Sequence, residues 1–183
     1  TPNLADPQAA VAALLAGNTR VARPAWDQMR IAPGGITADS LVLNLSGKLV
    51  NRGVLDVTHE LILRAAQGID NFGAAIHAGG GAWVRTGDLD NRQGSLQARS
   101  LYAELDGDLD NNGGLIRASE WADIQIGGDL IATRGRFLAD AGQLYLSAAG
   151  DIDLQAGEVK GSGGVTLVAG RDLRLGTVTE TRT

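Results

Sequence analysis

The sequence predicts an all-β solenoid in which about seven coils of about 20 residues stack on one another. The phrase that begins at Gly87, "GDLDNRQGSLQAR", returns at Gly107 as "GDLDNNGGLIRAS". A glycine followed closely by an aliphatic residue recurs at this interval at Gly47, Gly68, Gly87, Gly107, Gly128, Gly150 and, for a seventh unit, Gly170 or Arg171. Such a fixed period indicates a repeated building block rather than a single site.

The composition favours strands and turns in a chain of 183 residues, long enough for one domain with a substantial core. Glycine occurs 26 times and proline only 4 times, which is unlike collagen or a disordered tract, so we expect the glycines in turns. Hydrophobic residues make up 44% of the chain but aromatic residues only 4%, which predicts a layered core of Leu, Ile, Val and Ala. The absence of cysteine excludes disulfide bonds and thiolate metal sites.

The charge and the hydropathy pattern exclude several classes of function. A net charge of −5 disfavours a protein that tracks nucleic-acid phosphates, because that role requires clustered cations. No stretch approaches the roughly 18 to 20 uncharged apolar residues of a membrane span. The first 30 residues lack the charged start and apolar run of a signal peptide, so we expect either a cytoplasmic protein or a piece of a longer chain.

Each unit divides into three short alternating runs, which predict three strands per coil and leave no room for a helix. In the unit from Gly87 the runs are "DLDN", "SLQAR" and "SLYAELD". Because side chains alternate between the two faces of a strand, equivalent aliphatic positions should stack as ladders inside the solenoid. The first strand supplies Leu49, Ile69, Leu89, Leu109, Leu130, Ile152 and Leu173. The second supplies Leu55, Ile76, Leu96, Ile116 and Val159. The third supplies Leu61, Leu63, Ala82, Val84, Leu101, Leu105, Ile124, Ile126, Leu144, Leu146, Val165 and Leu167.

An asparagine recurs at one corner of four successive units, at Asn51, Asn71, Asn91 and Asn111. A glycine follows each within three residues. Both residue types tolerate positive φ, and stacked Asn amides can hydrogen-bond to one another, so a structural turn ladder is predicted here. The next two units carry Ala132 and Leu154 at this position, where we expect the corner to change shape.

The N-terminal part carries no repeat, and we divide the chain into residues 1–34, an N-terminal helix and connector or cap, and residues 35–183, the β-helix. Asp6 can cap a helix, Pro7 suits its first turn, "QAAVAALLA" follows, and Gly17 can end it. A helix here could cover an exposed strand edge at the end of a rod roughly 30 to 35 Å long. Residues 1–30 could equally connect to an upstream region, and residues 18–35 look irregular.

Polar motifs offer little catalytic chemistry. The histidines, His59 and His77, are too few for most metal or triad arrangements and are interpreted as surface residues. Acidic residues repeat at Asp88, Asp108, Asp129 and Asp151, with second carboxylates at Asp90 and Asp110. They could form a Ca²⁺-binding stripe, but a corner role accepting backbone N–H groups is the favoured interpretation. "GGG" at 79–81 is a turn rather than a phosphate loop. We expect no catalytic residue, no metal and no cofactor.

A recurring set of aromatic residues indicates a role beyond a purely structural one. Trp83, Tyr102, Trp121 and Tyr145 fall in or just before the third strand of successive units, flanking the inward aliphatic residues. If they project outward they form an aromatic row, with Arg85 nearby and Glu104 and Asp123 alongside, that could bind sugar rings or a protein partner. The alternative is a ring ladder that only stabilises its own sheet.

The phrases "GDLDNNGGLIRA", "GDLDNRQGSLQA", "GIDNFGAAIHA" and "GRDLRLG" resemble the haemagglutinin repeats of the filamentous-haemagglutinin family, which includes two-partner-secretion adhesins and contact-dependent inhibition exoproteins. The resemblance covers roughly residues 35–179. It implies a right-handed parallel β-helix within a long fibre. It also implies secretion by an outer-membrane transporter and display at the bacterial cell surface.

The function that the resemblance implies is a non-catalytic rod segment of a secreted filamentous adhesin, which mediates or spaces attachment to host or bacterial cells. Its expected partner is a host or bacterial surface receptor or glycan, with no nucleic acid and no membrane insertion. Two alternatives remain open. One is a glycosaminoglycan-binding module, for which Arg134 and Arg136 are the nearest basic pair. The other is a polysaccharide lyase or hydrolase on the same fold, which would need a cleft with converging carboxylates and a basic residue.

Overall fold

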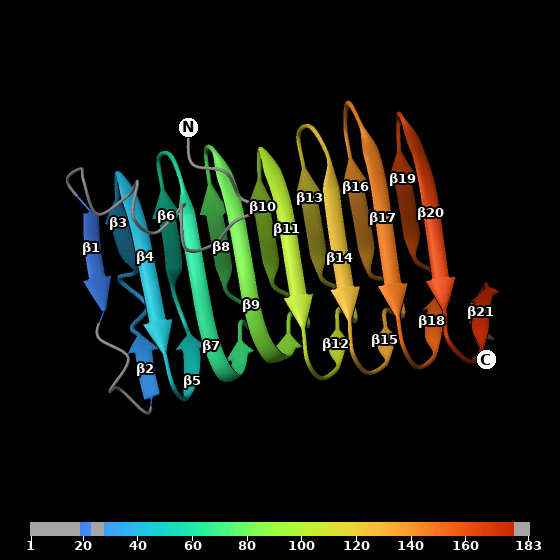
Figure 1. Cartoon of the computed structure of the whole chain (residues 1–183), viewed down its shortest axis with the longest axis horizontal. Coiled ribbons are helices and arrows are strands. Elements are labelled where there is room, and N and C mark those ends of the chain that lie inside the picture. The colour runs from blue at the N-terminus through green and yellow to red at the C-terminus, as the bar shows by residue number, and fades with distance from the viewer. Residues whose placement is uncertain (1–18, 23–27, 178–183) are drawn as a thin grey trace, which may run out of the picture.

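The chain folds into a parallel β-solenoid of about seven turns of about 21 residues. The computed structural model describes residues 19–22 and 28–177, and Figure 1 shows their strands stacked along one axis. The chain descends along the front strands and rises along the back strands as it advances toward the C-terminus, so the coil is right-handed (Figure 1). Among the described residues, no helix is long and apolar enough to span a membrane.

Each coil contributes to three rows of strands, which we name by their place in Figure 1. The front row contains β1 (Thr19–Ala22), β4 (Ser40–Leu45), the first part of β7 (Leu61–Asp70), the first part of β9 (Gly81–Asp90), β11 (Ser100–Leu105), β14 (Ala122–Ile126), β17 (Gln143–Ala148) and β20 (Gly164–Ala169). The lower row contains β2 (Gln28–Ile31), β5 (Lys48–Asn51), the second parts of β7 and β9, β12 (Leu109–Asp110), β15 (Leu130–Ile131), β18 (Ile152–Gln155) and β21 (Leu173–Gly176). The back row contains β3 (Ile36–Ala38), β6 (Val54–Val57), β8 (Ala75–Ala78), β10 (Ser95–Ala98), β13 (Leu115–Ala118), β16 (Arg136–Ala139) and β19 (Glu158–Gly161).

The front and lower rows belong to one 14-stranded sheet, and the back row is a separate 7-stranded sheet. The long strands β7 and β9 run through the corner between the front and lower rows, and the register between them shifts between Ala65 and Gly68. In the described residues every strand pairing is parallel, as stacking of one coil on the next requires.

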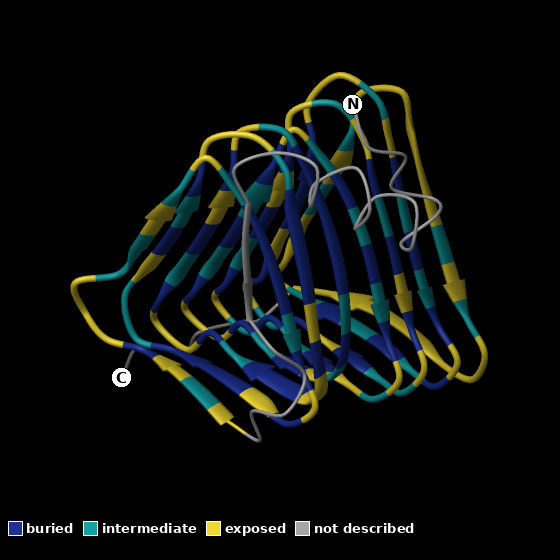
Figure 2. Ribbon diagram, turned by 60° about the vertical axis from the view of Figure 1, so that its left-hand side comes forward, coloured by how far each residue is buried: buried dark blue, intermediate teal, exposed yellow. Residues whose placement is uncertain are grey.

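The interior consists of aliphatic ladders in the registers that the sequence predicts. Leu49 pairs with Ile69, and the same column continues through Leu89, Leu109, Leu130, Ile152 and Leu173. In the back row Phe137 stands between Ile116 and Val159, and it is the one large ring of the buried ladder. The sequence-based columns did not include Phe137. Buried residues run along the sheets, while exposed residues gather at the corners (Figure 2).

Strand pairing extends ahead of residue 35, where the sequence pattern placed the start of the β-helix. β1 pairs in parallel with β4, and β2 pairs in parallel with β5. Residues 19–22 and 28–31 therefore belong to the solenoid rather than to an irregular connector, because an extended segment can join a parallel ladder through its backbone without carrying the repeat motif. The predicted helix over residues 7–16 lies outside the described residues.

The corner between the lower and back rows contains the asparagine ladder. Asn51 Nδ2 donates to Asn71 Oδ1 (2.8 Å), Asn71 Nδ2 to Asn91 Oδ1 (2.8 Å), and Asn91 Nδ2 to Asn111 Oδ1 (2.7 Å). All four side chains are fully buried. Each amide also donates to a carbonyl of the next back-row strand, as Asn91 does to Leu115 (3.2 Å). The ladder thus satisfies polar groups that would otherwise be costly to bury.

The conformation of this corner differs from the expectation in one respect. Positive φ occurs at the second residue after the asparagine, at Gly73 (61°), Gln93 (54°) and Gly113 (62°), and not at the asparagines. The glycine that follows this positive-φ residue is needed for a different reason, the close approach of the adjacent coil. At Gly94 a Cβ would overlap the backbone oxygen of Asn71, and at Gly114 it would overlap that of Asn91. These glycines are required by close approach of adjacent coils rather than by their dihedral angles.

The corner keeps its shape where the asparagines end, contrary to the expected change. Gly135 N–H donates to Ala132 O (3.2 Å), just as Gly114 N–H donates to Asn111 O (3.0 Å). Positive φ persists at Arg134 (56°) and Ala156 (50°). Ala132 and Leu154 are buried in the core. The backbone therefore determines the conformation of the corner. Its interior can be filled either by a ladder of asparagine amides or by a column of apolar side chains.

Candidate functional site

The four aromatic residues of the predicted row do not share one column. Trp83 is in register with Tyr102, Tyr102 with Asp123, and Asp123 with Tyr145. Trp121 precedes Asp123 by two positions and lies outside β14, at the corner where the chain enters the front row. The sequence pattern included Trp121 in the row because its spacing from Tyr102 equals the spacing of Tyr102 from Trp83, whereas the longer turn of this coil shifts the register.

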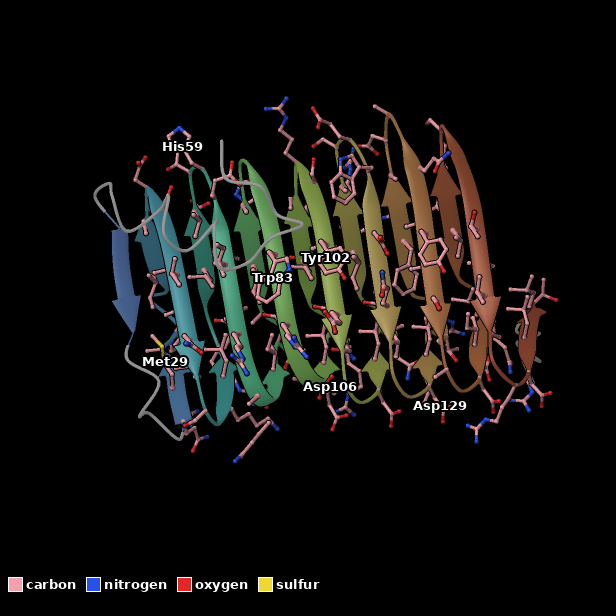
Figure 3. The ribbon with its side chains drawn as sticks, in the orientation of Figure 1. Met29, His59, Trp83, Tyr102, Asp106 and Asp129 are labelled. Atoms are coloured by element: carbon pink, nitrogen blue, oxygen red, sulfur yellow. The ribbon has the colours of Figure 1, made fainter. Side chains whose placement is uncertain are left out.

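The aromatic side chains also differ in exposure. Trp83 is 5% exposed and Trp121 is 39% exposed, while Tyr102 and Tyr145 are half-buried. Trp83 and Tyr102 lie on neighbouring strands of the front row (Figure 3). Trp83 joins Val42 and Ile62 in a buried cluster separate from the main core, and Tyr102 packs against it. Of the four predicted binding residues, Trp83 is therefore too buried to meet a large partner directly.

Charged residues run beside the aromatic column on the outer face of the front row. Arg85 Nη2 lies 3.7 Å from Glu104 Oε1, and the two residues are in register on β9 and β11. Burial raises the pKa of the Tyr102 phenol, and the negative charges of Glu104 and Asp123 raise it further. The Tyr102 phenol is thus neutral at neutral pH.

The repeated aspartates form a second hydrogen-bonded ladder, at the start of the lower row. The backbone N–H of Asp108 donates to Asp88 Oδ1 (2.8 Å), that of Asp129 to Asp108 Oδ1 (2.7 Å), and that of Asp151 to Asp129 Oδ1 (2.8 Å). Asp172 N–H continues the ladder to Asp151 Oδ1 (3.1 Å). These bonds correspond to the structural role that the sequence favoured for the aspartates.

The glycine of each "GD" pair has a matching purpose. A Cβ on Gly107 would overlap the carboxylate of Asp88, and a Cβ on Gly128 would overlap that of Asp108. The glycine therefore leaves room for the carboxylate of the preceding coil, which then accepts the next backbone N–H. This pair of roles accounts for the phrase that the sequence repeats.

A second acidic column lies beside the first and is paired with arginines. Asp70 binds Arg52 through both oxygens, at 2.8 and 2.6 Å. Asp90 binds Arg92, which stacks over the Phe72 ring with its guanidinium carbon 5.4 Å from the ring centroid. Hydrogen bonds from these arginines lower the pKa of Asp70 and of Asp90. Both carboxylates are thus held ionised, the opposite of what a general acid needs.

Within the described ranges, no group of three or more His, Asp or Glu residues is arranged to hold a metal ion. The space above the two acidic columns is an open depression of about 300 Å³, lined by Asp88, Asp90, Arg92, Asp108 and Asp110. Arg92 lies in this depression, and its guanidinium is 3.8 Å from the Asp110 carboxylate. The Ca²⁺ stripe considered from the sequence thus has an arginine among its carboxylates.

The histidines are exposed and lie in different columns. His77 Nδ1 is 2.8 Å from Asp56 Oδ1, and His59 Nδ1 is 2.9 Å from Asp39 Oδ1. Each pair joins adjacent coils on the surface. The interpretation as surface residues agrees with these positions.

A polar groove on the outer face of the back row has no counterpart among the sequence predictions. It holds about 160 Å³ and is lined by His77, Gln97, Arg99, Arg117, Ser119 and Asp140 among others. Arg99 pairs with Glu120 and Arg117 with Asp140, each at 2.8 Å. Register between β8, β10 and β13 brings these residues together, and no single motif could indicate that.

Of the basic pair considered for binding sulphated sugars, Arg134 and Arg136, the second forms an ion pair with a neighbouring glutamate. Arg136 Nε lies 2.8 Å from Glu158 Oε2 on the next back-row strand, so its charge is compensated locally. Arg134 stands at the positive-φ position of the preceding corner. The pair therefore does not present two uncompensated cations to an anionic chain.

Comparison with protein-family models, with characterised proteins and with solved structures finds no significant match. The fold is therefore established by the parallel β-solenoid itself, and these comparisons show no family for the chain.

Proposed function

We propose that this chain is a non-catalytic rod segment of a secreted, surface-displayed filamentous adhesin. The resemblance of its repeat phrase to filamentous-haemagglutinin repeats motivates the proposal, and the parallel solenoid is the fold that this resemblance implies. In this role the segment mediates or spaces attachment to host or bacterial cells, and an outer-membrane transporter would export the full-length protein.

The observation that carries the proposal is the uninterrupted stacking of ladders up to the last described coil. Val165, Leu173 and Leu175 are 42%, 45% and 62% exposed, although Val165 and Leu173 continue columns that are buried in the preceding coils. These side chains lie in the last coil of the described residues, in which β20 and β21 keep the register of the coils before them. A regular stack of this kind is suited to holding other regions at a distance.

The use of the carboxylates supports a non-catalytic role. Asp88, Asp108 and Asp129 each accept a backbone N–H, and Asp70 and Asp90 are paired with arginines. A glycosidase or lyase needs carboxylates poised with a raised pKa or free to abstract a proton. The acidic residues that the repeat supplies are committed instead to joining one coil to the next.

The proposed contact surface is the C-terminal half of the outer front-row face. Trp121 lies beside β14 and is exposed, and Tyr145 lies on β17 and is half-buried. Rings of this kind contribute strongly to recognition of glycans and proteins. A surface receptor or glycan is therefore the proposed partner.

The test is binding of the fluorescently labelled chain to epithelial cells and to Gram-negative bacteria. A Trp121→Ala/Tyr145→Ala variant is compared with a Gln125→Ala/Thr166→Ala variant, which alters polar residues on the same face. Loss of binding in the aromatic variant alone indicates an adhesive segment, and no binding by the unaltered chain indicates a spacer. Release of reducing ends or unsaturated products from surface polysaccharides would refute the non-catalytic role.

A heparin column distinguishes the glycosaminoglycan alternative. Because an anionic sugar chain binds through exposed cations, such binding should weaken with salt and with Arg134→Gln/Arg136→Gln. We expect the chain to pass through without retention at physiological salt. Retention that both changes abolish would favour the sugar-binding alternative.

A further inference from the structure

The polar groove on the outer face of the back row forms where one corner of the solenoid is shorter than its neighbours. Register fixes both ends of three successive corners, which begin after His77, Gln97 and Arg117 in the back row and end before Ala82, Leu101 and Ala122 in the front row. The corners therefore contain four residues (78–81), three residues (98–100) and four residues (118–121). The middle corner is recessed between the other two, and the groove lies over it.

Short and long side chains alternate around this recess. Gly79 and Ser119 contribute little volume, whereas Arg99 and Arg117 reach outward from the surface. The short residue at 79 is required by the fold, because a Cβ there would overlap the backbone oxygen of Thr58. The groove of about 160 Å³ is thus a consequence of how the coils stack.

Each basic side chain of the groove already has a carboxylate partner. The nitrogen–oxygen distances in the pairs His77–Asp56, Arg99–Glu120 and Arg117–Asp140 are each 2.8 Å. An anionic ligand would have to displace a carboxylate from its basic partner, and a cationic ligand would have to displace the basic side chain. The pattern of charge therefore favours an uncharged ligand.

The polar side chains at the centre of the groove are not used by the fold. Gln97 stands in register between His77 and Arg117 and is half-buried. Within the part of the chain that the structure describes, neither the Gln97 amide nor the Ser119 hydroxyl has a hydrogen-bond partner. An amide and a hydroxyl each supply both a donor and an acceptor.

The ion pairs leave further hydrogen-bonding atoms beside these two residues. Arg99 donates to Glu120 through Nε, so its terminal N–H groups remain for a ligand. Both contacts of Arg117 go to Oδ2 of Asp140, which leaves Oδ1 as a further acceptor. The groove thus combines charged and neutral donors with charged and neutral acceptors, and hydrogen bonds to charged groups are the stronger ones.

We infer that the polar groove binds an uncharged saccharide. Each sugar hydroxyl donates and accepts hydrogen bonds, which is the chemistry that the groove offers without net charge. The residues that line it include no large apolar side chain, so an apolar ligand would leave its polar groups unsatisfied. From His77 to Asp140 the groove crosses four successive coils, about 14 Å, which suits an elongated ligand.

This site is separate from the aromatic contact surface. The back row is a sheet of its own and faces away from the front row, which carries Tyr145 and the corner at Trp121 (Figure 1). That the saccharide belongs to a cell surface rests on the proposed function, whereas binding of a saccharide in the groove does not. The rod would then have contact surfaces on two sides.

Saturation-transfer difference NMR of the full chain tests the inference. The uncharged probes are lactose, maltose, mannobiose and chitobiose, and the charged probes are glucuronic acid and glucosamine. We expect at least one uncharged disaccharide to give a signal that does not change with salt, since no net charge is involved. The charged probes should give weaker signals.

A double variant assigns the signal to the groove. Gln97→Ala/Ser119→Ala removes the two unpartnered side chains and should weaken binding about tenfold, because each change removes hydrogen bonds to the ligand. The matched control, Gln125→Ala/Ser147→Ala, changes the same residue types on the front row and should bind like the parent chain. Ser119→Trp fills the groove without altering its ion pairs and should abolish the signal. Far-UV circular dichroism and urea midpoints should be alike in all these chains.

Several outcomes would overturn the inference. These are no signal from any of the four disaccharides, a stronger signal from a charged probe, a signal that falls steeply with salt, or an equal loss in the groove variant and its control. Trp121→Ala/Tyr145→Ala should keep saccharide binding. If that variant loses only its attachment to cells, the two surfaces act independently. If the parent chain binds cells but no saccharide, the groove is rejected and the adhesive function remains.

Discussion

The N-terminal and C-terminal coils share one backbone but fill it differently. At the lower-to-back corner, Asn71, Asn91 and Asn111 form a buried amide ladder, whereas Ala132 and Leu154 fill the same column with apolar groups. The turn hydrogen bond persists in both halves, as does the positive φ two residues further on. The stacked backbone therefore determines the conformation of the corner. The side chain there needs only to be apolar or to have its polar groups hydrogen-bonded.

The outer face of the front row divides at nearly the same place. Val42, Ile62 and Trp83 form a buried apolar cluster, while Asp123 and Thr166 occupy the same column further along. The outer face of the front row thus has a buried apolar half and a more exposed polar half. Substitutions matched between the two halves test how far this difference extends.

The largest effect is expected at the corner glycines. A Cβ at Gly114 would overlap the backbone oxygen of Asn91, and a Cβ at Gly135 would overlap that of Asn111. Because backbone of an adjacent coil cannot move aside cheaply, we expect each change to alanine to cost on the order of 4 kcal/mol of unfolding free energy, measured by urea denaturation.

Gly73→Ala is the matched control for the two corner glycines. Gly73 has positive φ, but a Cβ added there would meet no atom within 4 Å, so only about 1 kcal/mol should be lost. A much smaller cost at Gly135 than at Gly114 would show that the two halves do not share one corner.

The next largest effect concerns the outer face. Trp83→Ala removes a buried ring from this apolar cluster and should cost about 3 to 4 kcal/mol of unfolding free energy. Trp121→Ala, in the more exposed half, should change the unfolding free energy by no more than about 0.5 kcal/mol. Thermal and urea melts of the two variants compare them directly. Equal costs would mean that the two halves of the face are not different.

The asparagine ladder predicts an intermediate effect. Asn91→Ala removes two amide–amide bonds and leaves buried groups of Asn71 and Asn111 without those partners, so we expect a loss of about 2 to 3 kcal/mol. Asn111→Ala, at the last rung, removes only one such bond and should cost less. Denaturant midpoints with unchanged m-values are the measurement. A greater loss at Asn111 than at Asn91 would contradict a cooperative ladder.

The smallest effect is a dependence on pH. The pKa of Asp70 is lowered in the folded state, chiefly by its hydrogen bonds to Arg52, so its stabilisation is present above the unfolded pKa near 4 and is lost as pH falls through the folded pKa. At 18% side-chain exposure and with solvent screening, the pair should contribute about 1 kcal/mol.

Melting of the Asp70→Asn chain at pH 7 and at pH 3 checks this contribution. The variant should be less stable than the parent chain at pH 7, and the difference should shrink at pH 3. Arg52→Gln should produce the same pattern, and the double variant should lose little more than either single one. A difference that grows in acid would contradict the assigned sign.

The sequence by itself determined the period, the three strands of each coil and the inward columns, because burial of one face of a strand demands aliphatic residues at alternate positions and stacking repeats them. It also contained the asparagine and aspartate ladders, since both recur with the coil. Pairing of β1 and β2 could not be predicted from the motif, because backbone hydrogen bonds can recruit strands that lack it.

Only the tertiary structure decided which aromatic residues are accessible. Trp83, Tyr102 and Trp121 have equal spacing, yet a longer turn moves Trp121 out of register and places Asp123 in the column. Exposure depends on what lies above a sheet, which periodicity within the sheet does not encode. The groove at His77 and Arg117 likewise arises from register between coils, where residues distant in the chain become neighbours.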